Sequence, residues 1–218
     1  MPTAATSCNP QCDAMEDDVG YCGVDRSIVA SVGTRYLNAR NAPRNAQVVA
    51  AYRQLQLEID RLFNDLVGAD QPRAVRVAFS RCHQPYASDK ELIAAVGAHE
   101  TLEITSAAAF SGRLHPLLSC EIGGEFDRFR AIHDLIGHGW LGEGFDIDGE
   151  CAAWLAQGRL HSDLAGWALA SEIWGVNSAR WVTGETPELK AVLLDLDTLS
   201  TPIGNLSKPR RPENGETG

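Results

Sequence analysis

The chain has 218 residues, a formal net charge of −10 and an apolar fraction of 44%. This length suits one domain with a full hydrophobic core. The negative charge argues against nucleic acid as a partner, because binding to its backbone depends on Lys and Arg contacts to phosphates. No apolar run approaches the roughly 20 residues of a membrane helix, and the N-terminus lacks the pattern of a secretory signal. We therefore expect a cytoplasmic protein with no membrane partner, whose six cysteines stay reduced.

The composition divides the chain into three parts. Residues 1–24 carry Cys8, Cys12 and Cys22 among acidic residues, and this spacing fits no zinc motif, so we interpret them as a flexible leader. Residues 201–218 are rich in Pro, Gly and charge, which is typical of a disordered tail. One globular domain over 25–200 is therefore expected, with its candidate site within 115–178.

The spacing of apolar residues predicts mostly helices. In chain order we expect helices over 26–38 and 43–66, a strand over 74–80, a helix capped by Ser88, a strand over 102–105, and helices over 126–138, 149–161, 162–174 and 187–199. This pattern indicates an α+β protein that is predominantly α-helical, with a helical bundle-like core and a small strand-helix-strand insert.

The segment FRAIHDLIGH, residues 129–138, carries the strongest local signal. One face of the expected helix holds Phe126, Phe129, His133 and Ile136, which predicts that His133 points into the core. A buried imidazole needs a partner. Asp134 and His138 lie four residues apart, so the carboxylate can orient the imidazole or both can reach one ion.

The next two expected helices add further polar groups. Offsets of four, seven and eleven place four residues on one helical stripe: Glu150, Trp154, Gln157 and His161. Glu172 lies on an otherwise apolar or small face of the following helix, where a buried carboxylate is costly unless it is paired or bound to a metal. Asn177 comes shortly after it and can direct its amide toward the same cleft.

Imidazole and carboxylate groups without a sulfur set are typical of non-haem iron, manganese or catalytic zinc. We expect His133, His138, Glu150 and Glu172 as metal ligands, with Asp134 orienting a histidine, His161 as proton donor or acceptor, and Asn177 beside them. Three consecutive helices carry the set, as in bundle metal sites. Any single histidine of this kind is more often a hydrogen-bonded core residue. Whether His83, His115 or Gln157 joins the site is left open.

These residues form the motif FRAxHDxxGH, then GExxAW, then ExxGxN, and the motif resembles a family of actinobacterial and phage proteins. The resemblance extends upstream through Pro85-Tyr86 and His115-Pro116 and covers about half the chain. It implies that His133, Asp134, His138, Glu150, Glu172 and Asn177 occupy the family's motif positions. A histidine is usual in the family where this chain has Gln157, and His161, one turn later, is the candidate to replace it. The resemblance names no substrate.

Three functions follow as hypotheses. The leading one is a metal-dependent enzyme, a non-haem iron oxidoreductase or oxygenase acting on a small molecule, because two histidines and a carboxylate leave coordination positions free. Four tryptophans would keep its pocket dry: Trp140, Trp154, Trp167 and Trp174. The second is a zinc or manganese hydrolase with Glu150 or Glu172 as general base. The third is a non-enzymatic accessory module in which the cluster is only a buried hydrogen-bond network.

Overall fold

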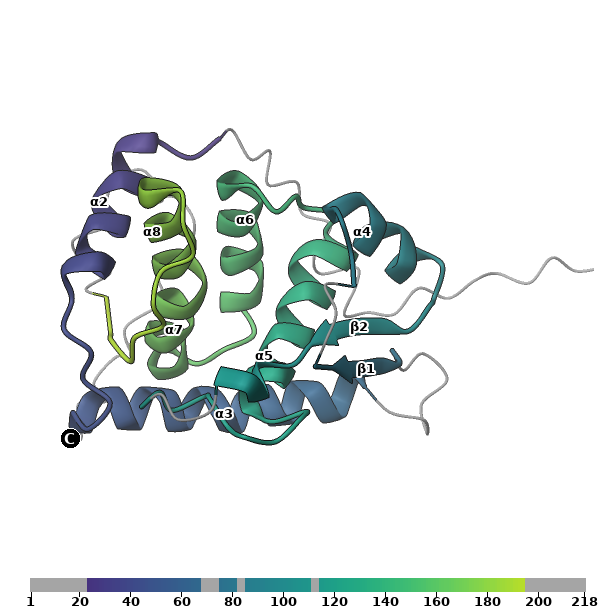
Figure 1. Ribbon diagram of the computed structural model, residues 1–218, viewed down its shortest axis with the longest axis horizontal. Coiled ribbons are helices and arrows are strands. Elements are labelled where there is room, and N and C mark those ends of the chain that lie inside the picture. The colour runs from purple at the N-terminus through teal and green to yellow at the C-terminus, as the bar shows by residue number, and fades with distance from the viewer. Residues whose placement is uncertain (1–22, 68–74, 82–84, 111–113, 195–218) are drawn as a thin grey trace, which may run out of the picture.

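The protein is predominantly helical and carries one small sheet, so the expected α+β class is confirmed (Figure 1). The computed structural model describes residues 23–67, 75–81, 85–110 and 114–194. The cysteine-containing leader up to residue 22, His83 and the expected tail lie outside these ranges. Within them, no helix is both long and apolar enough to cross a bilayer.

Most of the predicted helices and strands are present, with shifted ends. The elements in chain order are α2 (Arg26–Asn38), α3 (Ala46–Leu66), β1 (Val77–Ser80), α4 (Asp89–Gly97), β2 (Leu102–Thr105), the 3-10 turn η1 (Ala107–Phe110), α5 (Glu125–His133), the π-helix η2 (Asp134–Trp140), α6 (Ile147–Gly158), α7 (Asp163–Ala170), the π-helix η3 (Ser171–Gly175) and α8 (Val176–Thr183). Asn45, not Pro43, starts α3, because its side chain accepts hydrogen bonds from the amides of Gln47 and Val48.

Strands β1 and β2 pair in parallel, with Val77 opposite Leu102 and Ser80 opposite Thr105. Helix α4 connects them, as parallel pairing requires a crossover. Apolar side chains from the sheet, α4 and the α5–η2 helix form one small core: Leu92, Val96, Leu102, Ile104, Ala131 and Leu135. The sheet and α4 thus support one side of the helix that carries His133.

The main core lies where α3 packs against α5 and α7. In Figure 1, α3 runs beneath the upright helices α2, α6, α7 and α8. Tyr52, Leu55 and Ile59 of α3 are fully buried there, against Ile132 of α5 and Leu169 of α7. A second core joins α2 to α6, η3 and α8. The bundle therefore encloses the residues expected to carry chemistry.

The helix expected over 187–199 is wrong for residues 187–194, which have no regular secondary structure, and the rest lies outside the described ranges. The preceding helix instead continues through η3 and α8 and ends at Gly184, which adopts a left-handed conformation with φ 73°. The amide of Lys190 then donates to Tyr36 Oη and that of Ala191 to Asn41 Oδ1. This segment is apolar because it packs against α2 and α3, not because it is helical.

Candidate metal centre

The π-helix η2 brings His133 and His138 together. Two residues five positions apart point about 140° apart around an α-helix, whereas the wider turn of a π-helix, closed by i→i+5 hydrogen bonds, reduces this angle. The amide of Leu141 donates to the carbonyl of Ile136 over such a five-residue step, at 3.3 Å. The Nε2 atoms of His133 and His138 consequently lie 3.2 Å apart, with the rings in a T-shaped arrangement.

The other nitrogen of each ring is held by an oxygen. His138 Nδ1 lies 3.0 Å from the backbone carbonyl of Glu143, which can only accept, so Nδ1 carries the proton and Nε2 keeps its lone pair. His133 Nδ1 lies 3.3 Å from Gln157 Oε1, and its Nε2 lies 3.2 Å from Glu150 Oε2; both oxygens accept, so either nitrogen of this ring can carry the proton. With that proton on Nδ1, both Nε2 atoms would present lone pairs toward one point.

Glu150 brings a carboxylate to that point from the first turn of α6. Its Oε2 lies 3.2 Å from His133 Nε2, and its Oε1 lies 3.9 Å from His138 Nε2. Asn177 Nδ2 donates to Oε2 at 2.8 Å and so fixes the carboxylate. The side chains of His133 and Glu150 are each 11% exposed, whereas that of His138 is 1% exposed. One side of the cluster therefore reaches solvent.

Asp134 is close to the same group. His133, Asp134 and His138 each offer a ligand atom, and these atoms lie within 4.8 Å of one another. This group could hold a metal ion. The expected role of Asp134 in orienting a histidine is filled by other groups, since Gln157 and the Glu143 carbonyl hold the two Nδ1 atoms. Asp134 contributes negative charge at this position.

Burial and charge move the pKa values of these groups in different directions. Burial lowers the pKa of His133, but the hydrogen bond and charge of Glu150 outweigh it, and the net shift is upward. For His138, burial and the neighbouring charge of His133 lower the pKa. Burial also raises the pKa of Asp134, against the opposing charges of His133 and Arg130. His133 is therefore easier to protonate than a free imidazole, and His138 is harder to protonate.

Gly137 allows η2 to approach α6 closely enough for these contacts. A Cβ atom at this position would lie 2.4 Å from the Cβ of Ala153, a distance that no pair of real side chains adopts. Ala153 is fully buried and sits on α6 between Glu150 and Gln157. Gly137 thus sets the spacing between the histidines and the residues that hold them.

Glu172, expected as a metal ligand, belongs to a different buried cluster. Its Oε1 accepts hydrogen bonds from the hydroxyl of Tyr52 and, at 3.0 Å, from Nε2 of His115. His115 Nδ1 accepts from the amide of Leu117, which fixes the proton of this ring on Nε2. Glu172 Oε2 is buried without a hydrogen-bond partner among the described residues. The structure does not place this carboxylate in contact with His133 or His138.

His161 also lies elsewhere, because α6 ends at Gly158 and the expected stripe does not extend that far. His161 Nδ1 pairs with Glu58 Oε2 of α3 at 3.0 Å, and the amide of Ser162 donates to the same oxygen. The pair joins the loop before α7 to α3. In the described part of the chain, no contact links His161 to His133 or His138, and its proton-transfer role stays a prediction.

The expected tryptophans differ in their packing and exposure. Trp154 and Trp174 stack in parallel with ring centres 5.8 Å apart, and Trp174 is fully buried. Trp140, at the end of η2, is 46% exposed. Phe145, which the sequence did not single out, packs on His138 at 4.8 Å and is itself 42% exposed. The aromatic contacts of the two histidines thus come from phenylalanines, Phe129 on His133 and the partly exposed Phe145 on His138.

Fold and site together define a helical protein with a buried histidine–carboxylate group that could hold a metal ion. The chain matches no protein-family model, no curated protein and no solved structure. The family resemblance of the motif is therefore still a prediction. Function has to be argued from the geometry of the site alone.

Proposed function

We propose that this protein is a metal-dependent enzyme in which His133, His138 and Glu150 hold one divalent ion, with Asp134 beside it. Iron is the preferred ion, and the preferred activity is oxidoreductase or oxygenase chemistry on a small molecule. The ion would supply open coordination positions for oxygen and substrate. The chain would supply the ligands, their orientation and a site with one exposed side.

One observation carries the proposal. The Nε2 atoms of His133 and His138 lie 3.2 Å apart, and the other nitrogen of each ring lies against an oxygen on the opposite side. A carboxylate oxygen lies 3.2 Å from His133 Nε2. Acceptors this close to one another require a positive group between them, either a proton on His133 Nε2 or a metal ion. A divalent ion meets this requirement with ordinary ligand types.

The ligand types favour iron over a structural zinc. The group contains two imidazoles and one or two carboxylates, and neither of the cysteines in the described part of the chain, Cys120 and Cys151, belongs to it. Two histidines with one carboxylate is the ligand set of many non-haem iron enzymes that use oxygen. Gln157 and Asn177 act on the ligands through hydrogen bonds, as partners of metal ligands usually do.

The second candidate is a zinc or manganese hydrolase at the same site. The position of Asp134 favours it, because this carboxyl group lies near both histidines without being held by either. Burial raises its pKa, and the resulting basicity suits a general base that takes a proton from a bound water. The bound metal distinguishes the two candidates.

The rival reading is a buried hydrogen-bond network with no metal. In this alternative the side-chain amide of Gln157 is rotated by about 180°, which exchanges its oxygen and nitrogen. Nε2 of Gln157 then donates to His133 Nδ1, and His133 Nε2–H donates to Glu150. That arrangement would give a partner to the Gln157 Nε2 atom, which is buried without one as the side chain stands. This reading requires that the protein bind no metal and survive chelation unchanged.

Elemental analysis of untagged protein, before and after anaerobic incubation with Fe²⁺, tests the proposal. We expect near-stoichiometric iron in the wild type and its loss in His138→Ala and Glu150→Ala. The matched control is His99→Asn, which removes an exposed histidine whose φ of 57° asparagine tolerates. Oxygen uptake in substrate trials with the iron form would support the oxidoreductase.

Each other outcome has a defined meaning. Bound zinc or manganese, lost in the same two variants, would move the proposal to the hydrolase. Absence of bound metal, with no rise in melting temperature on adding iron, zinc or manganese, would overturn the enzyme proposal and favour the network. Metal that persists in both variants would show that the ion binds elsewhere.

A further inference from the structure

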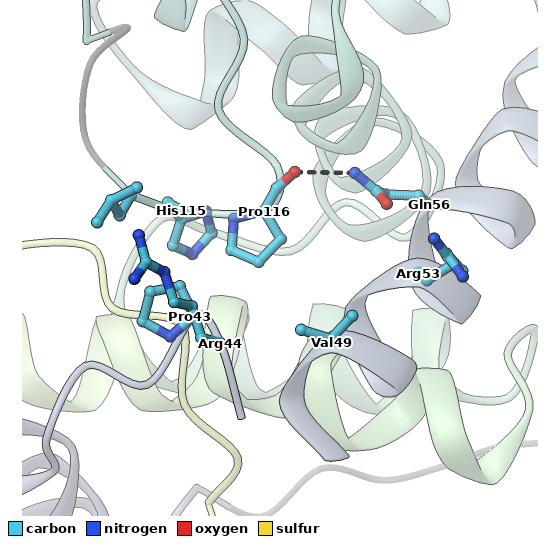
Figure 2. Close-up of a pocket in the computed structure, with 8 residues that line it drawn as sticks. Pro43, Arg44, Val49, Arg53, Gln56, His115 and Pro116 are labelled. Atoms are coloured by element: carbon cyan, nitrogen blue, oxygen red, sulfur yellow. Dashed lines mark hydrogen bonds between the residues drawn. The ribbon is translucent and has the colours of Figure 1, made fainter. Parts of the chain in front are cut away.

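A surface cavity of about 360 Å³ lies at the start of α3, against the loop that carries His115 (Figure 2). Its lining consists of Pro43, Arg44, Val49, Arg53, Gln56, Leu114, His115 and Pro116. The volume is at the lower end of the range for small-molecule sites. None of the lining residues is acidic, although the chain carries 29 acidic and 19 basic residues.

Arg44 and Arg53 carry the positive charge of this cavity. Both are exposed, and neither forms an ion pair or hydrogen bond within the described part of the chain. By contrast, Arg128 pairs with Asp60 and Arg26 pairs with Asp148. Figure 2 shows Arg44 on the side of His115 and Arg53 on the side of Gln56. Two guanidinium groups therefore border one hollow without an acidic partner.

The start of α3 adds to this potential. A helix carries partial positive charge at its N-terminus, and the first turn of this 21-residue helix contains no acidic residue to offset it. Pro43 and Arg44 come directly before its cap, Asn45. An anion in the cavity would meet this field together with the guanidinium groups.

The opposite wall is held in place before any ligand binds. Gln56 Nε2 donates to the carbonyl of Pro116 at 2.8 Å, which ties the loop to α3 (Figure 2). His115 packs edge-on against Tyr52 at 5.4 Å and is hydrogen-bonded to Glu172 behind it. Pro43, Val49, Leu114 and Pro116 make much of the lining apolar. The cavity thus combines basic groups with a preformed apolar surface.

We infer that this cavity binds a small organic anion, with an apolar body against Pro43, Val49 and Pro116 and a phosphate or carboxylate head attracted by the positive charge that Arg44, Arg53 and the start of α3 place around the cavity. Planar guanidinium groups bind both kinds of head in a bidentate manner. This site is separate from the proposed metal centre and does not depend on it.

Isothermal titration calorimetry with phenyl phosphate, benzoate, inorganic phosphate and neutral benzyl alcohol tests the inference. We expect saturable binding of phenyl phosphate or benzoate, weaker binding of inorganic phosphate, and none of benzyl alcohol. The stronger of the first two identifies the head group. Arg44→Gln and Arg53→Gln should each weaken binding roughly tenfold, the loss expected for a charge-assisted hydrogen bond, and the double variant should abolish it.

Arg180→Gln is the matched control, because it removes an exposed arginine on α8 that does not line the cavity. We expect it to bind as the wild type does, and His138→Ala likewise, which separates this inference from the metal proposal. All the substituted arginines are exposed, so the variants should melt at the wild-type temperature. Absence of binding by every charged probe, unchanged affinity in the double variant, or equal loss in Arg180→Gln would overturn the inference.

Discussion

Two buried histidine–carboxylate clusters in this protein use similar residues in different ways. Around His133, the Nε2 atoms of His133 and His138 face each other and a carboxylate oxygen, and only the His133 ring can bring a proton to that point. Around Glu172, Tyr52 and His115 both donate to one carboxylate oxygen. The first arrangement has at most one donor for its acceptors, whereas the second already supplies two donors. The group that contacts Nδ1 determines which ring nitrogen carries the proton. In His138 a backbone carbonyl accepts from Nδ1, whereas in His115 a backbone amide donates to Nδ1.

The largest expected effect breaks only the first cluster. Gly137→Ala places a methyl group against Ala153, and we expect the free energy of unfolding to fall by about 2–3 kcal/mol, the cost of overpacking a core. The metal content should fall as η2 moves away from α6. Chemical denaturation and elemental analysis measure the two effects.

Gly166→Ala serves as its control, since a Cβ atom there meets no neighbouring atom within 4 Å. This helical variant should be more stable than the wild type by about 0.5–1 kcal/mol and keep its metal. Equal behaviour of the two variants would show that the contact between η2 and α6 does not position the site.

The second expected effect concerns the Glu172 cluster alone. Tyr52→Phe removes a buried donor to the carboxylate, so we expect a loss of about 1.5–3 kcal/mol of stability with unchanged metal affinity. Tyr86→Phe removes an exposed hydrogen bond from the amide of Glu103 and should cost less than about 0.5 kcal/mol. Thermal melts and metal titration check both. Loss of metal in Tyr52→Phe would show that the two clusters act as one site.

A third variant acts on the first cluster and, unlike Tyr52→Phe, should lower metal affinity. Gln157→Leu removes the oxygen that holds His133 Nδ1, and we expect metal affinity to fall about 10–100-fold, as it does when the hydrogen-bond partner of a ligand is lost. Stability without metal should also fall, by about 1–3 kcal/mol, because His133 Nδ1 loses its buried hydrogen-bond partner. Competition with a chelator measures the affinity. An unchanged affinity would support the network reading.

The smallest expected effect is a pH dependence at His161 and Glu58. Burial lowers the pKa of His161, and the charge of Arg61 lowers it further, against the opposing effect of Glu58. The folded state therefore binds fewer protons than the unfolded state as pH falls below about 6.5, the unfolded value. The stability associated with neutral His161 is present in full above that pH and is lost as pH falls toward the pKa of His161 in the folded state. We expect a slope of at most about 1.4 kcal/mol per pH unit in this window, and a smaller slope in His161→Gln.

Glu58 adds a second acid-sensitive contribution. Burial by itself raises its pKa, but hydrogen bonds from Gln54, Ser162 and His161 outweigh it, and the net shift is downward. Its stabilisation is present above the unfolded pKa of about 4.3 and is lost below it. Denaturation curves at several pH values separate the two windows. A slope between pH 7 and 5 that His161→Gln leaves unchanged would contradict the assignment.

The periodicity of apolar residues was sufficient for most of the fold. The strand Leu102–Thr105 and the helix Arg26–Asn38 have the expected ends, and Ser88 caps α4 as expected. The helix expected over 187–199 is wrong for residues 187–194 because apolar residues at this spacing also suit an irregular segment packed on two helices. Local pattern does not distinguish these cases when long-range hydrogen bonds, such as that from Ala191 to Asn41, decide the conformation.

The candidate site was harder to predict than the fold. Stripe analysis grouped Glu150 with Gln157 correctly, and both contact His133. It also included His161, because it assumed that α6 extends beyond Gly158. The contact between His133 and His138 depends on a π-helix, which no spacing rule for an α-helix predicts. Tyr52 and Glu58 were missed as polar partners because each lies on α3 among apolar residues, more than 100 residues from its partner.

The central claim is that His133, His138 and Glu150 form one ligand set, and a titration with Co²⁺ followed by visible absorption tests it most directly. The absorption of protein-bound Co²⁺ reports the type and number of its ligands. We expect bands that saturate near one equivalent of Co²⁺, collapse in His138→Ala and persist in His115→Gln and His99→Asn. Absence of saturable bands in the wild type, or bands of equal intensity in His138→Ala, would contradict the account.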